Sequence, residues 1–338
     1  MTLQERIRAF ASLGNRMASL AGDQSFASVL ASARHHNAWF TSEQVMHAVS
    51  EWSGLLTEKR LEAWLKPYAL EDGTGKPLHI GVVNAGNIPL VGFHDCMSVL
   101  ISGHSYIGKN ASDDKVLLPY MAKLLVEAEP RFETRISFAG KLAGFDAVIA
   151  TGSNNTARYF EYYFGKYPHI IRKNRNGVAV LEGNESRQEL EALGEDVFRY
   201  FGLGCRNVAH LLLPEGYDFS KLFGAFEKFA EVKNHHKYNN NYEYYRAVLT
   251  LKKVPFYDNG FLIVKKDETI ATPVSIMNYS FYQSPDEADR WLERQKENIQ
   301  CILSSRHIPF GQSQSPALDD YADGVDTVDF LARLKGKG

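Results

Sequence analysis

The chain has 338 residues, of which 44% are hydrophobic and 23% are charged, and these values are ordinary for a globular protein. A formal net charge of −2 excludes the broad positive potential that attracts nucleic acid or anionic membranes. No apolar run approaches the roughly 20 residues that span a bilayer, and the first ten residues lack the apolar centre of a signal peptide. We therefore expect a cytoplasmic protein without a membrane span.

Residues 1–67 carry apolar positions at helical spacing and predict a series of helices. From residue 78 onward, short apolar runs alternate with longer amphipathic stretches. Such alternation predicts a parallel sheet with helical crossovers. The strand-like runs of this first series are Leu78–Val83, Ser105–Lys109, Arg135–Ala139, Ala147–Thr151 and Val178–Leu181.

A second alternating series follows residue 205, and the length of the chain accommodates two cores. Its strand-like runs are Val208–Leu213, Phe261–Lys265, Val274–Phe281 and Gln300–Ser304, and its helix-like runs are Phe219–Val232 and Pro285–Asn298. Between them, Asn234–Tyr245 is rich in asparagine, histidine and tyrosine, which favours a surface loop near a substrate.

The three cysteines differ in context, and none forms the C-x-x-C pair typical of a zinc site, so we expect no metal. Cys96 and Cys301 lie in apolar segments and are predicted to be small core residues. Cys205 instead follows two glycines, Gly202 and Gly204, which let a backbone turn sharply toward a ligand. The neighbouring Arg206 would favour its thiolate.

Two segments run from a strand through a polar turn into a helix. The first is Val82–Leu90 (VVNAGNIPL), and the second is Ala147–Ser153 (AVIATGS). Turns of this kind lie at the carboxyl edge of a parallel sheet, where the N–H groups of a helix N-terminus can bind a pyrophosphate.

In this order the segments resemble the aldehyde dehydrogenase superfamily. Asn84–Leu90 followed by Ser102–Lys109 is similar to its Trp-Asn-Phe-Pro loop and its strand ending in lysine, and Ala150–Ser153 resembles its Phe-Thr-Gly-Ser. Further matches are Phe201–Val208 with its Gly-Gln-x-Cys loop, Glu268 with Pro273–Val274, and Pro309–Gly311. Phe145–Asn155 and Tyr321–Thr327 look typical of its acyl-CoA reductase branch, the LuxC-type fatty-acid reductases.

The resemblance implies an α/β fold with two Rossmann-related parallel-sheet domains. Residues 1–200 would form the N-terminal helices and the dinucleotide-binding domain, on which residues 306–338 would pack. Residues 201–305 would form the catalytic domain that carries the cysteine.

For the chemistry, the resemblance implies an acyl-CoA or acyl-protein thioester reductase. Cys205 would attack the thioester and form an acyl-enzyme, which hydride from NADPH would reduce to an aldehyde. The Asn87 amide and the Cys205 N–H would hold the oxyanion. The other partners that we expect are a second copy of the chain or an acyl-activating enzyme.

For the cofactor, Lys109 would reach the adenosine ribose. Thr151, Gly152 and Ser153 would approach the pyrophosphate, and Glu268 would bind the nicotinamide ribose. Ser112 stands where NAD-preferring relatives carry a glutamate that binds the 2′-hydroxyl, so NADP(H) is favoured, with NAD(H) as the alternative and with Asp113 and Asp114 close by.

The main departure concerns the glutamate with which aldehyde-oxidising relatives hydrolyse the acyl-enzyme. The matching region near Ile171–Val178 has none, which favours reduction of thioesters, although Glu182 lies nearby and competes for the assignment.

Two alternatives stay open. A cofactor-independent cysteine acyltransferase or thioesterase would need a histidine base, for which His210 and the His235–His236 pair are candidates. A non-catalytic acyl-carrier-binding subunit would need neither Cys205 nor Asn87.

Overall fold

The computed structural model describes residues 1–70 and 77–334, which separate into two compact units. The first contains residues 1–173 and the chain from 317 onward, and the second contains residues 174–316. The boundary that we expected at residue 200 therefore falls inside the second unit, because β6 (Asn176–Val180) pairs with two strands of the second sheet. The returning segment begins at 317 rather than 306, and its last four residues lie outside the described residues.

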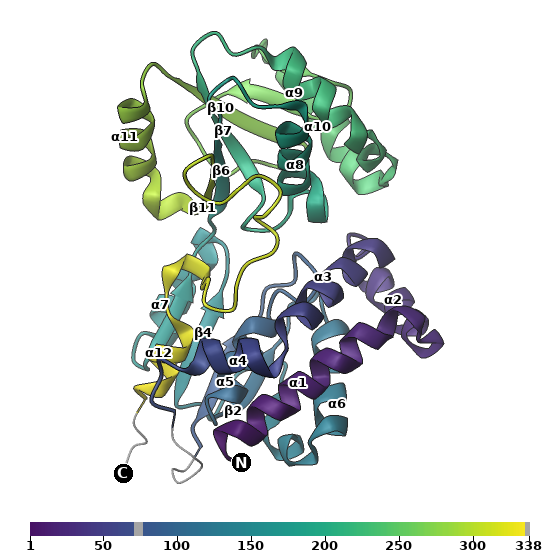
Figure 1. Ribbon diagram of the computed structural model, residues 1–338, viewed down its shortest axis with the longest axis vertical. Coiled ribbons are helices and arrows are strands. Elements are labelled where there is room, and N and C mark those ends of the chain that lie inside the picture. The colour runs from purple at the N-terminus through teal and green to yellow at the C-terminus, as the bar shows by residue number, and fades with distance from the viewer. Residues whose placement is uncertain (71–76, 335–338) are drawn as a thin grey trace. The chain divides into compact units, whose positions relative to one another are not determined.

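The first seventy residues are helical, as predicted (Figure 1). The helices are α1 (Leu3–Ser19), α2 (Gln24–His36), α3 (Ser42–Leu55) and α4 (Glu58–Leu65). Helix α1 begins at a capping box, in which Thr2 and Glu5 each accept a hydrogen bond from the other's backbone N–H. Its buried Phe10, Leu13 and Met17 recur at helical spacing, so one face of α1 packs into the core of the first unit.

The first sheet has five parallel strands in the order β3-β2-β1-β4-β5. The strands are β1 (His79–Val83), β2 (Ser105–Lys109), β3 (Ile136–Phe138), β4 (Ala147–Thr151) and β5 (His169–Arg172). The helices α5 (Phe93–Ile101), α6 (Leu117–Ala128) and α7 (Asn154–Phe164) connect them. Residues 147–150 of β4 have no exposed surface, as expected for a strand covered on both faces.

The C-terminal segment belongs to the first unit and ends in α12 (Thr327–Ala332). The Tyr321 hydroxyl accepts a hydrogen bond from the Trp64 indole N–H at 2.8 Å, and Asp326 caps α12. Arg172 of β5 donates to the Thr327 hydroxyl at 2.8 Å. The Tyr321–Thr327 motif therefore attaches the end of the chain to α4 and β5.

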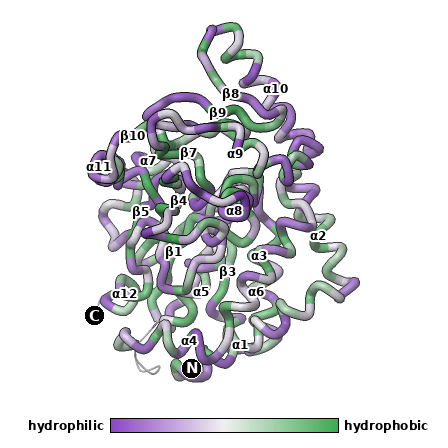
Figure 2. The backbone as a smooth tube through the Cα atoms, turned by 45° about the horizontal axis from the view of Figure 1, so that its top comes forward, coloured by the Kyte–Doolittle hydropathy of each residue, from purple (hydrophilic) through white to green (hydrophobic). Residues whose placement is uncertain are grey.

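The second sheet has the order β11-β6-β7-β10-β9-β8, with β8 as its antiparallel edge strand. The further strands are β7 (Val208–Pro214), β8 (Tyr257–Asp258), β9 (Ile263–Lys266), β10 (Ile276–Tyr282) and β11 (Ile299–Leu303). The helices of this unit are α8 (Arg187–Phe198), α9 (Phe219–Phe226), α10 (His236–Leu251) and α11 (Pro285–Gln295). Helix α11 is mostly hydrophilic (Figure 2) and buries only its stripe of Ala288, Trp291 and Leu292.

The expectation of a surface loop over Asn234–Tyr245 is wrong, because α10 begins at His236. Tyr238 and Tyr242 are buried, and the Tyr242 hydroxyl donates to Asp258 at 2.7 Å. Tertiary contacts of these tyrosines thus stabilise a helix that the composition disfavours.

Candidate functional site

In the first unit, the predicted polar segments meet at the carboxyl edge of the sheet. Asn84–Asn87 follow β1, Ser112 lies shortly after β2, and Gly152 and Ser153 follow β4. The chain moves outward from β1 to β2 and β3 on one side, and returns to place β4 and β5 on the other. The β1 and β4 turns therefore flank the topological switch point, where open α/β sheets bind their ligands.

The turn after β1 is held by buried side chains. Asn84 is 7% exposed, and its amide donates to the Tyr106 hydroxyl at 2.6 Å and to Asn110 at 2.8 Å. A Cβ added to Gly86 would lie 2.8 Å from the Cβ of Ala111, so glycine permits this close approach. Asn87, in contrast, is exposed at the surface of the turn.

The turn after β4 opens α7. The Ser153 hydroxyl accepts a hydrogen bond from the Thr156 N–H at 3.3 Å and caps the helix. A Cβ at Gly152 would lie 2.9 Å from the Phe160 ring and 3.0 Å from Thr156. Thr151, Gly152 and Ser153 thus lead into a helix N-terminus, with a backbone free of a side chain at Gly152, a geometry that fits a pyrophosphate.

The turn after β2 carries the residues that the resemblance assigns to the adenosine ribose. Lys109 is the last residue of β2, and its carbonyl accepts a hydrogen bond from the Asn84 N–H at 3.0 Å. The Ser112 hydroxyl donates to the exposed Asp113 carboxylate at 3.2 Å. Burial raises the pKa of Asp114 to about 6, and its carboxyl group caps α6. The carboxylate of Asp113 therefore lies beside the neutral Ser112, which stands where NAD-preferring relatives carry a glutamate.

In the second unit, Cys205 lies in the turn between α8 and β7, at the amino edge of the sheet. Tyr200, Phe201 and Gly202 have φ of 53°, 57° and 76°, so three successive residues adopt the left-handed conformation. For tyrosine and phenylalanine this conformation is strained, and such strain is typical of functional turns. Cys205 is half-buried and is not in a disulfide.

The other cysteines are core residues, as predicted. Cys96 lies in α5 and is 4% exposed, and burial raises the pKa of its thiol. Cys301 lies in β11, is 7% exposed, and donates to the Arg206 carbonyl at 3.6 Å. The Arg206 side chain donates through Nε to the Ser313 carbonyl, so part of its guanidinium binds backbone.

Glu268 lies apart from Cys205 within the second unit. It follows β9, and its carboxylate accepts a hydrogen bond from the Trp291 indole N–H at 2.6 Å. The backbone N–H of Asp267 donates to the Tyr279 carbonyl at 3.1 Å, and Tyr279 pairs with Leu211 in the register of β10 and β7. Glu268 thus lies against α11, beside the middle of β7, whereas Cys205 precedes the first residue of that strand.

The register also decides the role of Glu182. Val180, the last residue of β6, pairs with Leu212, and Glu182 follows at the carboxyl edge of the sheet. Since β6 and β7 are parallel, Cys205 lies at the opposite edge, and Glu182 cannot serve as its hydrolytic base. Near the position indicated by the resemblance, β5 ends at Arg172, whose guanidinium forms an ion pair with the buried Asp95 at 2.6 Å.

The candidate histidines are separated by their surroundings. His210 is fully buried in β7, donates through Nδ1 to the Thr269 carbonyl at 3.2 Å and stacks on Trp291 at 4.6 Å. Burial lowers the pKa of His210 to about 4. The centre of the His235 ring lies 4.5 Å from the centre of the Phe201 ring. Phe201 stands four residues before Cys205. His235 is thus the histidine whose ring contact reaches the cysteine turn.

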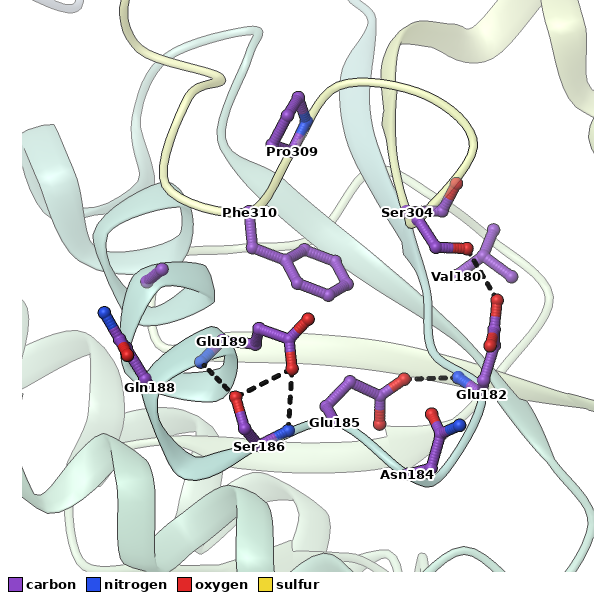
Figure 3. A pocket seen from close by; sticks show the side chains of 12 residues that line it. Val180, Glu182, Asn184, Glu185, Ser186, Gln188, Glu189, Ser304, Pro309 and Phe310 are labelled. Atoms are coloured by element: carbon purple, nitrogen blue, oxygen red, sulfur yellow. Dashed lines mark hydrogen bonds between the residues drawn. The ribbon is translucent and has the colours of Figure 1, made fainter.

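A pocket with a volume of ≈ 550 Å³ lies at the carboxyl edge of the second sheet, beside the ends of β6 and β11 (Figure 3). The Glu185 carboxylate accepts the N–H groups of Glu182 and Gly183, and Glu189 forms a capping box with Ser186. Glu185 and Glu189 therefore line the pocket because their carboxylates hold the local turn and the start of α8. The pocket is at the edge opposite to Cys205.

Two polar residues near Cys205 escaped the sequence analysis. Asn207 is 1% exposed and bonds to the Gly204 N–H of the cysteine turn, and Asp196 is fully buried and accepts hydrogen bonds from the backbone of residues 311 and 313. The one signal in the sequence is that Asn207 stands two positions after Cys205, directly before the apolar run of β7. A polar side chain buried at such a place needs hydrogen-bond partners. Among the described residues, no cluster of three or more metal-ligand side chains occurs, and no helix is long and apolar enough to span a membrane.

No family model matches the chain, and no curated protein sequence matches it. Solved structures do. An aldehyde dehydrogenase from Mycobacterium tuberculosis in complex with NAD+ has 16% identity and a TM-score of 0.61, over 86% of this chain and 71% of its own. KauB, an aldehyde dehydrogenase from Pseudomonas aeruginosa, has 12% identity and a TM-score of 0.64, over 90% of this chain and 72% of its own. An aldehyde dehydrogenase from Bacillus cereus in complex with NAD+ has 14% identity and a TM-score of 0.62, over 90% of this chain and 72% of its own. At these identities the likeness concerns the fold: the chain has the aldehyde dehydrogenase fold, with two parallel-sheet units.

Proposed function

We propose that the protein is a nicotinamide-dependent oxidoreductase of aldehyde chemistry, and specifically an acylating enzyme that reduces acyl-CoA or acyl-protein thioesters to aldehydes. The observation that carries the proposal is the placement of Cys205. Of the three cysteines, it alone lies outside the core, in a strained turn at a sheet edge. The likeness to aldehyde dehydrogenase structures supports the same chemistry.

The first half of the proposed reaction is acyl transfer to the cysteine. The Cys205 thiolate attacks the thioester carbonyl, a carbon–sulfur bond forms, and the carrier leaves as a thiolate. The Asn87 amide and the Cys205 N–H stabilise the oxyanion, and each such donor contributes about 3 kcal/mol. Asn87 suits this role because it is exposed on a turn that Asn84 and Gly86 hold in place.

The second half reduces the acyl-enzyme. When bound, a nicotinamide dinucleotide would supply the hydride that this step requires at the acyl carbon. Gly152 and Ser153 would hold its pyrophosphate, Lys109 and Ser112 its adenosine ribose, and the oxyanion donors act again on the developing charge. Collapse of the cysteine hemithioacetal then breaks the carbon–sulfur bond, releases aldehyde and restores the thiolate. The assignment of Glu268 to the nicotinamide ribose stays a prediction that its bond to Trp291 does not favour.

The places of the two candidate hydrolytic positions favour reduction over hydrolysis. Glu182 is at the far edge of the sheet, and the strand expected to carry the hydrolytic glutamate ends at the ion-paired Arg172. Without a carboxylate base, water attacks an acyl-cysteine slowly. We therefore propose that the acyl-enzyme persists until it is reduced. NADPH is the preferred cofactor in this proposal and NADH the alternative, because Ser112 carries no charge whereas Asp113 does.

One test uses radiolabelled acyl-CoA with and without NADPH. We expect Cys205→Ser to abolish covalent label, Cys96→Ser to retain it, and labelled aldehyde to form only with NADPH. The contact of His235 with Phe201 favours a thioesterase or acyltransferase as the second candidate, which would release labelled acid or acyl product without cofactor. Absence of label in the wild-type protein would refute both and leave a carrier-binding module.

A further inference from the structure

A buried polar network connects the Cys205 turn to two other segments, and its centre is Asn207. Its Oδ1 accepts a hydrogen bond from the Gly204 N–H at 2.8 Å. Its Nδ2 donates to the carbonyls of Asp196 at 2.9 Å and Arg199 at 2.8 Å. One side chain therefore binds the chain on both sides of the left-handed residues 200–202.

The hydrogen bonds of Asn207 complete the end of α8 and close the turn around Cys205. The last carbonyls of a helix lack partners within it, and Asn207 supplies donors to carbonyls at the end of α8. Meanwhile, the Asn207 N–H donates to the Gly204 carbonyl at 3.1 Å, closing a tight turn around Cys205. Because the side chain has almost no exposed surface, water cannot replace these bonds.

Asp196 extends the network to residues 311–313, which begin with the last residue of the Pro309–Gly311 motif. Its carboxylate accepts hydrogen bonds from the backbone N–H groups of Gly311 and Ser313, the latter at 2.9 Å. The Ser313 carbonyl accepts the Arg206 side chain in return. The turn is therefore held from α8 and from residues 311–313, with Asp196 and Asn207 joining the two.

We propose that Asn207 is the positioning residue of the Cys205 thiol and that Asp196 anchors it. In this role Asn207 touches no substrate. Its bonds fix the backbone of the turn and thereby the orientation of the Cys205 side chain, which aligns the sulfur for attack and keeps it in the surroundings that favour the thiolate. The consequence for acyl transfer rests on the proposed function, whereas the consequence for thiol reactivity does not.

The decisive experiment measures the rate of iodoacetamide alkylation of Cys205 as a function of pH, with peptide mass spectrometry identifying the site. The test variant is Asn207→Ala. The control is Asn278→Ala, since Asn278 is also a 1% exposed asparagine of the second unit and donates to the Thr269 carbonyl at 2.8 Å, away from the turn. We expect the midpoint of the pH profile to rise by about one unit in Asn207→Ala and to stay in place in the control.

A purely structural role for Asn207 predicts a different result, in which both variants lose thermal stability and neither moves the midpoint. That result, or an equal shift in the two variants, overturns the proposal. Should Asn207→Ala not fold, Asp196→Asn preserves the side-chain volume and weakens the bonds to Gly311 and Ser313. It should shift the midpoint in the same direction by a smaller amount, and an unchanged midpoint again overturns the proposal.

Acyl labelling separates this proposal from the proposed function. If wild-type Cys205 takes up label from acyl-CoA, Asn207→Ala should do so about tenfold more slowly, and the control within about twofold of wild type. Equal labelling rates in Asn207→Ala and wild type contradict the positioning role. If wild type takes up no label, the proposed function fails, and the alkylation profiles still decide the role of Asn207.

Discussion

The two sheets present their candidate site residues by different means. At the carboxyl edge of the first sheet, topology brings the turns after β1, β2 and β4 together, and Gly86 and Gly152 allow the close approaches. At the amino edge of the second sheet, a single turn carries Cys205, and the buried side chains of Asn207 and Asp196 hold it. The order of the strands is thus enough to bring the turns of the first sheet together. The turn that carries Cys205 instead depends on hydrogen bonds from particular buried side chains.

The largest effect that sharpens this comparison is expected from Asn87→Ala. Loss of the exposed amide should raise the transition state for acyl transfer by about 3 kcal/mol, so acyl transfer should slow by about two orders of magnitude, a larger effect than any loss of stability. Single-turnover acylation and thermal unfolding measure the two effects. Asn84→Ala is the matched control, and it should lower the melting temperature because Asn84 is buried and bonded to Tyr106. A normal acylation rate in Asn87→Ala would remove this residue from the site.

The buried interior of the second sheet predicts a pH dependence of stability. Burial lowers the pKa of His210 from 6.5 to about 4, so the folded state disfavours its charged form. The resulting stability is present above pH 6.5 and is lost as the pH falls toward 4, by up to about 3 kcal/mol. Urea unfolding at several pH values should show this decline in the wild type. The decline should be weaker in His210→Phe, and identical slopes in the two proteins would contradict the assignment.

Gly152→Ala tests whether the narrow backbone after β4 binds the cofactor. The added methyl group would lie 2.9 Å from Phe160, so the turn must shift, and NADPH affinity should fall about tenfold. Gly140→Ala is the control, because no atom lies within 4 Å of its added Cβ. Titration of NADPH fluorescence measures the dissociation constants. Equal affinities in the two variants would place the pyrophosphate elsewhere.

The smallest effect concerns the choice of cofactor. Ser112→Glu adds a carboxylate that repels a 2′-phosphate, so the ratio of kcat/KM for NADPH to that for NADH should fall by about tenfold or less. Asp113 already supplies negative charge beside this position, which limits the change. Ser112→Ala should leave the ratio almost unaltered. A ratio that is the same in all three proteins would show that Ser112 does not contact the ribose.

The sequence predicted the elements whose signal is local. Ala147–Thr151 matches β4 because a continuous apolar run marks a strand covered on both faces, and Ser105–Lys109 matches β2. Helix α10 was predicted as a loop, since its stability comes from the burial of Tyr238 and Tyr242 against distant segments. The domain boundary lies at residue 174 rather than at 200, because β6 pairs with β7 and β11, which come later in the chain.

The candidate site shows the same limit. The residues of the first edge could be found because each lies at or shortly after the end of a strand, and Cys205 because two glycines precede it. The bonds of Asn207 and Asp196 depend on how α8, the turn and residues 311–313 meet, which no local pattern encodes. Glu268 shows the reverse situation, since its motif predicts a cofactor ligand, which stays a prediction, and its bond to Trp291 could not be read from that motif.

The most direct test of the central claim follows hydride into the product. Acyl-CoA is incubated with the protein and with NADPH deuterated at the transferring position, and the aldehyde is analysed by mass spectrometry. The proposed function predicts one deuterium on the aldehyde carbon, in the wild type and not in Cys205→Ser. Free acid as the only product, or aldehyde without deuterium, would contradict reduction of a cysteine-bound acyl group.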